Sequence, residues 1–151
     1  MNKPKVVTLC GSTRFWEAFR DQGLKLTLEG KIVLSIGICA PDSMVLANPE
    51  SEDGKRQKSM LDDLHKAKID LSDEILVLNV GGYIGNSTRG EVRHALQTGK
   101  LVRWLEPDKA DANLMRDHRC WSEPPKDERD GSTFCVVCRQ ITELLARSVA
   151  S

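Results

Sequence analysis

Hydrophobic residues along the first 105 positions alternate between short, largely apolar runs and stripes with helical spacing. The apolar runs cover residues 5–10, 32–38, 74–80 and 101–105. Runs of this length are typical of strands that are covered on both faces of a sheet. Strands that alternate with helices predict the α/β class, here a single doubly wound, open parallel sheet of four or five strands, flavodoxin-like or Rossmann-like. We expect the strand order 2-1-3-4.

The intervals between the apolar runs predict three helices. The first begins near Phe15, the second near Arg56, and the third has Ser87 or Thr88 as its N-cap. Gly99 lies just past the last turn of the third helix, as glycine commonly does.

The second helix carries an apolar stripe with spacings of four, three and four residues, formed by Met60, Leu64, Ala67 and Leu71. Such a stripe predicts the face of the helix that packs on the sheet. On the same helical wheel Asp63 flanks the stripe, whereas Asp62 points nearly opposite and is expected in solvent. Residues 39–55 contain Pro41, Pro49, Gly54 and several acids, and are expected to form a long loop that could act as a lid.

The composition changes after residue 106. Residues 107–133 are rich in Asp, Arg, Glu and Pro, and the apolar positions between Ile141 and Val149 predict a terminal amphipathic helix. We therefore expect an α/β domain over residues 1–106 and a polar C-terminal extension over residues 107–151.

The extension contains four residues of the types that bind zinc, His118, Cys120, Cys135 and Cys138. A tetrahedral zinc ion accepts such a set, and an ion bound there would be structural rather than catalytic. The simpler interpretation is a polar tail with reduced cysteines. Cys10 and Cys39 are expected to be simply buried, and no cofactor is expected to be required for catalysis.

The charge of the chain indicates what kind of partner it has. The 22 basic and 22 acidic residues cancel, and no block of five or more like charges marks a nucleic-acid arm or a membrane-binding segment. A small soluble ligand is therefore expected, rather than a nucleic-acid polymer or a membrane. The apolar stretch near the N-terminus is too short for a signal peptide or a membrane span, which predicts a cytoplasmic protein.

Two turns follow predicted strands and should lie at the carboxyl edge of the sheet, where doubly wound folds bind ligands. The first turn, Gly11-Ser12-Thr13-Arg14, offers backbone N–H groups, hydroxyls and a guanidinium at a helix N-terminus, which suits a phosphate. The alternative is that Ser12 or Thr13 only caps the helix and Arg14 is a solvated charge.

The second turn, residues 81–91, is rich in glycine and ends on Glu91. Thr88 and Glu91 have the spacing of a capping box, which alone could explain the glutamate. The glycines of the turn, Gly82 and Gly85 among them, leave its backbone open to close ligand approach, which a cap does not need. We therefore expect Glu91 to be catalytic.

These motifs resemble the nucleoside 2-deoxyribosyltransferase superfamily, which includes nucleotide N-hydrolases that cut deoxynucleoside monophosphates. The resemblance covers roughly the first hundred residues. It rests on residues 9–14, on Ser72-Asp73, and on the small-residue loop that leads to Gly90-Glu91. His65 together with residues 68–73 and 79–85 is similar to a largely uncharacterised bacterial branch of the superfamily.

The resemblance implies an enzyme, a hydrolase or a base transferase, that cleaves the N-glycosidic bond of a (deoxy)nucleoside 5′-monophosphate. Glu91 would be the nucleophile that attacks C1′ and forms a glycosyl-enzyme ester. The phosphate would be held by Ser12, Thr13, Arg14 and Ser87. The resemblance also implies a homodimer or larger homo-oligomer, in which a neighbouring chain could complete each cleft.

The superfamily usually carries a second acid on the helix before the third strand, and His65 stands at that position here. Asp63 could substitute for this acid. His65 could instead be the acid, since its ordinary pKa allows either protonation state near neutrality; the other interpretation is a partly buried structural histidine. Asn79 and Tyr83 could hydrogen-bond and stack on a base, unless the tyrosine packs on its own domain.

Three other functions stay open. A nucleotide-binding sensor or regulatory module without turnover would use the same two turns, and His65 in place of the expected acid favours it. The glycine-rich loop also resembles, less fully, that of the lysine-decarboxylase-like phosphoribohydrolases, which cleave N-glycosidic bonds too. The third alternative is a scaffold that recruits a partner through its Cys/His extension.

Overall fold

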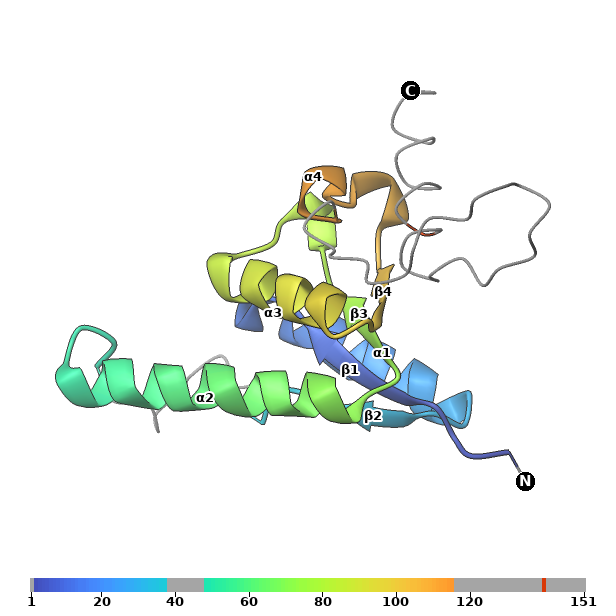
Figure 1. Cartoon of the computed structure of the whole chain (residues 1–151), viewed down its shortest axis with the longest axis horizontal. Helices are drawn as coiled ribbons and strands as arrows, with labels where there is room; N and C mark the ends of the chain where they lie inside the picture. The colour runs from blue at the N-terminus through green and yellow to red at the C-terminus, as the bar shows by residue number, and fades with distance from the viewer. Residues whose placement is uncertain (1, 38–47, 116–139, 141–151) are drawn as a thin grey trace, which may run out of the picture.

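A computed structural model of the protein describes residues 2–37, 48–115 and 140. A parallel sheet forms its centre (Figure 1). Its strands are β1 (Val6–Cys10), β2 (Ile32–Leu34), β3 (Glu74–Val77) and β4 (Leu101–Trp104). They lie in the order β2-β1-β3-β4, and each neighbouring pair is parallel. The predicted α/β class and the strand order 2-1-3-4 are therefore confirmed.

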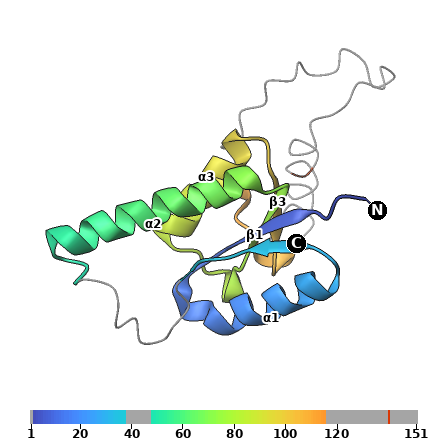
Figure 2. The same ribbon diagram turned by 90° about the horizontal axis from the view of Figure 1, so that it is seen from below.

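Helices cover both faces of the sheet. The helix α1 (Trp16–Leu28) lies on one face, and α2 (Glu52–Leu71) and α3 (Asn86–Gln97) lie on the other (Figure 2). On the α1 side, Phe19 packs with Leu9 and Leu78 in one apolar cluster. On the opposite side, Ile69 of α2 and Val92 of α3 belong to a second cluster. Short 3₁₀ turns at Thr13–Phe15, Val80–Gly82 and Pro107–Lys109 connect these elements.

The helix α2 begins at Glu52 rather than near Arg56. Ser51 is its N-cap, and the Ser51 hydroxyl accepts a hydrogen bond of 3.0 Å from the backbone N–H of Gly54. A Cβ atom at Gly54 would lie 1.9 Å from the carbonyl oxygen of Asn48, so only glycine fits against the preceding turn. The loop expected over residues 39–55 thus ends by Ser51, and residues 38–47 lie outside the described part of the chain.

The apolar stripe on α2 is not its buried face, and that prediction is wrong. Met60, Leu64 and Leu71 have exposed fractions of 59%, 52% and 74%. The side turned toward the sheet carries His65 and Ile69 instead, both of which are buried. The stripe misleads because a helix that borders a polar site buries polar side chains there, so that its apolar residues do not mark its inner face.

The first residues of the C-terminal extension belong to the core. Leu114 and Met115, on the short helix α4 (Ala112–Met115), are buried in the same cluster as α3. The side-chain amide of Gln140 hydrogen-bonds both backbone groups of Val102, which covers part of the edge of β4. The terminal helix predicted from Ile141 lies outside the described residues. No helix in the described ranges has the length and apolar character needed to cross a membrane.

Candidate active site

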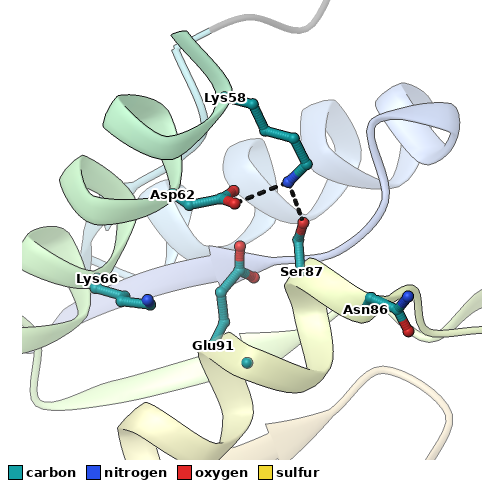
Figure 3. A pocket seen from close by; sticks show the side chains of 7 residues that line it. Lys58, Asp62, Lys66, Asn86, Ser87 and Glu91 are labelled. Atoms are coloured by element: carbon teal, nitrogen blue, oxygen red, sulfur yellow. Dashed lines mark hydrogen bonds and ion pairs between the residues drawn. The ribbon is translucent and has the colours of Figure 1, made fainter. Parts of the chain in front are cut away.

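A pocket of about 260 Å³ opens between α2 and α3 (Figure 3). Its lining comprises Lys58, Asp62 and Lys66 from α2 and Asn86, Ser87, Gly90 and Glu91 from α3. Behind Glu91 lies Cys10, the last residue of β1. The pocket is therefore at the carboxyl edge of the sheet, where open parallel sheets bind their ligands.

Glu91 is not a capping residue. The helix α3 starts at Asn86 with Gly85 as its N-cap and without a side-chain cap, so that Ser87 and Thr88 lie inside the first turn. The predicted cap at these two residues and the capping-box interpretation of Glu91 are therefore wrong. The glutamate lies in the second turn, and its carboxyl group points toward α2 (Figure 3).

The carboxyl group of Glu91 is held away from water. Glu91 is 8% exposed, and its Oε2 atom has no hydrogen-bond partner among the described residues. Burial raises the pKa of Glu91 from 4.5 to about 7, although a hydrogen bond from the Cys10 thiol opposes this shift. A carboxyl group that titrates near neutral pH inside a pocket is typical of a functional site.

His65 and Cys10 lie beside Glu91. The Nε2 atom of His65 is 3.8 Å from Glu91 Oε2 and 3.6 Å from the Cys10 sulfur. Burial, and then the nearby charge of Lys68, lower the pKa of His65 to about 4. Because His65 is already neutral at pH values where Glu91 ionises, the two side chains do not form an ion pair. Burial also raises the pKa of the Cys10 thiol, so this group stays protonated.

Asp62, not Asp63, is the acid of α2 that reaches the pocket. Lys58 Nζ donates hydrogen bonds to Asp62 Oδ2 at 2.8 Å and to Ser87 Oγ at 3.0 Å, which joins α2 to α3 across the pocket (Figure 3). The Asp63 side chain is 75% exposed and lies 4.0 Å from Lys66. The helical-wheel prediction therefore reversed the two aspartates, because it oriented α2 by the exposed apolar stripe.

The first turn is close to the glycine-rich loop but does not line this pocket. The Ser12 hydroxyl accepts a hydrogen bond of 3.4 Å from the backbone of Arg14, so the expected capping role is present. Thr13 and Arg14 are exposed, and the Arg14 guanidinium lies 4.2 Å from the centre of the Tyr83 ring. The rings of Phe15 and Tyr83 also pack in a T-shaped arrangement, with their centres 5.9 Å apart. Tyr83 therefore packs on its own domain, as one of the two interpretations expected.

Gly11 and Gly82 have structural roles that need no ligand. A Cβ atom at Gly11 would lie 3.0 Å from the Cβ atom of Leu78, so the turn after β1 passes close to the end of β3. Gly82 and its neighbour Gly81 have φ angles of 85° and 65°, which favour glycine. The Glu106 carboxylate accepts a hydrogen bond of 2.9 Å from the Gly81 N–H and holds this loop.

Asn79 is a structural residue, and the prediction that it contacts a base is wrong. Its side chain is fully buried. The amide nitrogen donates to the carbonyl oxygens of Glu106 and Lys109 at 2.9 and 3.3 Å, and the amide oxygen accepts from the Glu106 N–H at 2.9 Å. These bonds tie the loop after β4 to the end of β3 and occupy the side-chain amide of Asn79.

Replacing Asn79 with alanine is expected to lower the free energy of unfolding by about 1–3 kcal/mol, because three partly buried hydrogen bonds to the backbone of residues 106 and 109 are lost. Urea unfolding at pH 7 measures the change. Asn86→Ala, at an exposed asparagine that starts α3, is the control and is expected to change stability by less than about 0.5 kcal/mol. Equal losses in the two variants would contradict the structural role of Asn79.

The predicted zinc ligands cannot be placed, because His118, Cys120, Cys135 and Cys138 lie outside the described residues. Asp70, at the other end of α2, pairs with His94 at 2.6 Å, far along the helix from the pocket residues. Sequence reasoning missed Lys58, Lys66 and Asn86 as pocket residues, since nothing in their spacing distinguishes them from surface residues. Cys10 is buried as expected, but its position at the end of a predicted central strand was a signal that it could face the site.

No protein-family model matches the chain, and no curated protein is significantly similar to it. The resemblance to the nucleoside 2-deoxyribosyltransferase superfamily therefore stays a prediction.

Proposed function

We propose that this protein is an enzyme that cleaves the N-glycosidic bond of a (deoxy)nucleoside 5′-monophosphate. The observation that carries the proposal is the state of Glu91. Its carboxyl group is buried at the wall of the pocket, and burial raises the pKa of this group to about 7. Keeping such a group away from water lowers the stability of the fold, and residues that lower stability in this way are common at functional sites. A carboxylate also suits attack on an anomeric carbon, because the transition state carries positive charge.

In the proposed reaction, an ionised oxygen of Glu91 attacks C1′ of the sugar. The C1′–N bond breaks, its electron pair leaves with the base, and a glycosyl ester forms on Glu91. A water molecule then attacks C1′, the ester bond to Glu91 breaks, and the carboxylate is restored. The proton lost by that water balances the proton that the departing base takes up. If a second base attacks in place of water, the same intermediate leads to base transfer.

Other pocket residues support a substrate of this kind. Lys58 and Lys66 line the pocket, and their charges offset those of the Asp62 and Glu91 carboxylates, so an anionic substrate such as a nucleotide is not repelled. The Asp62 carboxylate is paired with Lys58 and can only accept hydrogen bonds, so we assign it to a sugar hydroxyl. His65, neutral and buried beside Glu91, keeps water from the carboxyl group.

The first turn is the proposed phosphate site, with Ser12, Thr13 and Arg14 as ligands together with Ser87. The Arg14 side chain is exposed and lies against the glycine-rich loop, and the Ser87 hydroxyl lines the pocket. Since a nucleoside lacks the phosphate, it should be a poorer substrate than its 5′-monophosphate.

The direct test is product analysis. Purified protein is incubated with a panel of ribo- and deoxyribonucleoside 5′-monophosphates and with the matching nucleosides, and free base is measured by chromatography. Release of base from at least one monophosphate, faster than from its nucleoside, is the expected result. Release from nucleosides alone would remove the phosphate from the proposal, and no release from any member would contradict the enzymatic function.

Asp62→Asn is expected to lower kcat/KM for base release by about 10- to 100-fold, the effect of losing one charge-assisted hydrogen bond. Asp63→Asn is the matched control, since it makes the same chemical change one residue away on the exposed side of α2. It should leave kcat/KM within about twofold of the parent, the effect of a surface change. The opposite order of effects would show that Asp63 is the acid of the site.

A homo-oligomer is supported by the exposed apolar residues Met60, Leu64 and Leu71 on α2. Large apolar side chains on one outer helix face are typical of a surface that packs on another chain. Leu64→Arg is expected to lower the sedimentation coefficient to that of a monomer. A parent protein that already sediments as a monomer would contradict this proposal.

A nucleotide-binding sensor is the second candidate, favoured by His65 at the position where the superfamily carries an acid. Its neutral state makes it a weak proton donor at pH 7. Tight binding of a nucleotide without base release over many hours would favour the sensor over the enzyme.

A further inference from the structure

We propose that Cys10, His65 and Glu91 form a binding site for a thiophilic divalent transition-metal ion such as zinc. The three side chains come from β1, α2 and α3, which meet at the carboxyl edge of the sheet. One donor atom from each, a sulfur, an imidazole nitrogen and a carboxylate oxygen, lies within 4.8 Å of the others. This site is separate from the Cys/His group of the C-terminal extension, and it does not depend on the proposed enzymatic function.

The distances between the donor atoms suit a tetrahedral ion. The Cys10 sulfur and His65 Nε2 are 3.6 Å apart, and His65 Nε2 and Glu91 Oε2 are 3.8 Å apart. Bonds of about 2.3 Å from zinc to sulfur and about 2.0 Å to nitrogen or oxygen place neighbouring donors about 3.3–3.6 Å apart. Small side-chain adjustments would therefore bring the three atoms to an ion without moving the backbone.

One of the three donor atoms is also short of a partner. Glu91 Oε2 has no hydrogen-bond partner in the described part of the chain, and all three residues are buried. The 3.8 Å between Oε2 and His65 Nε2 is too long for a hydrogen bond. A buried polar atom in this condition is costly, and a bound ion would satisfy it.

The chemistry of the set selects the ion. A thiolate with an imidazole favours zinc, cobalt or copper, whereas magnesium and calcium require oxygen ligands. Binding releases the Cys10 proton, and the resulting thiolate and the Glu91 carboxylate balance the two positive charges of the ion. The positive charge of the nearby Lys58 is paired with Asp62, which reduces its repulsion of the ion. Three protein ligands leave a fourth position for water on the pocket side, where Glu91 lines the open space.

Metal binding and the proposed reaction would exclude each other. A Glu91 oxygen that is bonded to an ion cannot attack a sugar carbon, so the ion would act as an inhibitor that a chelator reverses. The inhibition would arise through Glu91, because Cys10 and His65 form no covalent bond in the proposed reaction.

The test is a titration of chelator-treated, full-length protein with Co²⁺, observed through the thiolate-to-cobalt charge-transfer absorption. The decisive variant carries serine at Cys39, Cys120, Cys135 and Cys138, so that Cys10 is its only thiol. We expect this variant to develop the absorption at one equivalent of Co²⁺, and we expect a further Cys10→Ser or His65→Asn change to abolish it. Absence of the absorption in the folded single-cysteine variant would overturn the proposal.

A second measurement covers the case in which four replacements prevent folding. In the otherwise unchanged chain, Cys10→Ser should bind one equivalent of Co²⁺ less than the parent, and an unchanged stoichiometry would overturn the proposal. The outcome is distinct from that of the proposed function. Base release by metal-free protein with no cobalt site at Cys10 would refute the metal site alone, and cobalt binding without base release from any nucleotide would refute the enzymatic function alone.

Discussion

Glu91→Gln is expected to reduce base release by at least about a thousandfold, because the glutamine amide cannot form the glycosyl ester. The substitution keeps the size of the side chain, and Glu91 makes no capping bond whose loss could disturb α3. Chromatographic measurement of free base under single-turnover conditions gives the rate. Glu50→Gln makes the same chemical change at an exposed position and should keep full activity. A Glu91→Gln protein that releases base as fast as the parent would show that the nucleophile is another group.

The pH profile of the parent should report the same carboxyl group. Since burial raises the pKa of Glu91 to about 7, kcat/KM should fall about tenfold for each pH unit below that value as the nucleophile becomes protonated. An acid limb near the ordinary glutamate pKa of 4.5 would indicate that Glu91 is not the group that must ionise.

Glu91→Gln is also expected to stabilise the protein, but only at alkaline pH. The pKa of Glu91 is about 7 in the fold and 4.5 when the group is unperturbed, so the folded state holds its proton more tightly than the unfolded state. The stability that belongs to the protonated form is fully present below pH 4.5 and is lost as the pH rises through about 7. The shift corresponds to a loss of about 3 kcal/mol of stability when the carboxyl group ionises. Glutamine recovers only part of this stability, because its amide is also a buried polar group.

We therefore expect Glu91→Gln to exceed the parent in free energy of unfolding by about 1–3 kcal/mol at pH 8.5, and by little at pH 5. Urea unfolding at the two pH values measures the difference. His65 also lowers stability in acid, as the pH falls from 6.5 toward about 4. Because both proteins contain His65, this effect cancels to first order in the comparison. A parent that is more stable than the variant at pH 8.5 would show that the ionised carboxylate is well satisfied in the fold.

The arrangement of the sheet could be predicted from the sequence because it depends on patterns that have few physical solutions. Four apolar runs separated by helical segments leave little choice but a covered parallel sheet, and the crossover rule then orders the strands. The position of Glu91 at the carboxyl edge follows from the same rules, since the glycine-rich loop comes directly after β3. These predictions used only local patterns and general topology.

The orientation of α2 could not be predicted in the same way. Its apolar residues Met60, Leu64 and Leu71 face outward, and its inner face carries His65. A hydrophobic stripe identifies the buried face only where the neighbouring surface is apolar, and here the helix borders a polar pocket and offers an apolar face to the outside. The exchange of Asp62 and Asp63 follows directly from this one error in rotation.

The roles of individual polar residues depend on contacts that are distant in the sequence. Asn79 is occupied by backbone groups of Glu106 and Lys109, about thirty residues further along the chain, and no local pattern reveals that. The cluster of Cys10, His65 and Glu91 likewise joins three separate elements. Asp73 shows the same effect: its carboxylate accepts a hydrogen bond of 2.7 Å from the backbone N–H of Val6, at the opposite end of β1 from the pocket.

The covalent role of Glu91 is tested most directly by mass spectrometry of a trapped intermediate. A nucleotide substrate with fluorine at C2′ slows hydrolysis of the ester, because the electron-withdrawing group destabilises the positively charged transition state. After a short incubation with metal-free protein and an acid quench, the protein should gain the mass of one fluorinated sugar phosphate, and fragmentation should locate it on Glu91. Release of base from this substrate with no such adduct at any time, or an adduct on another residue, would contradict the account.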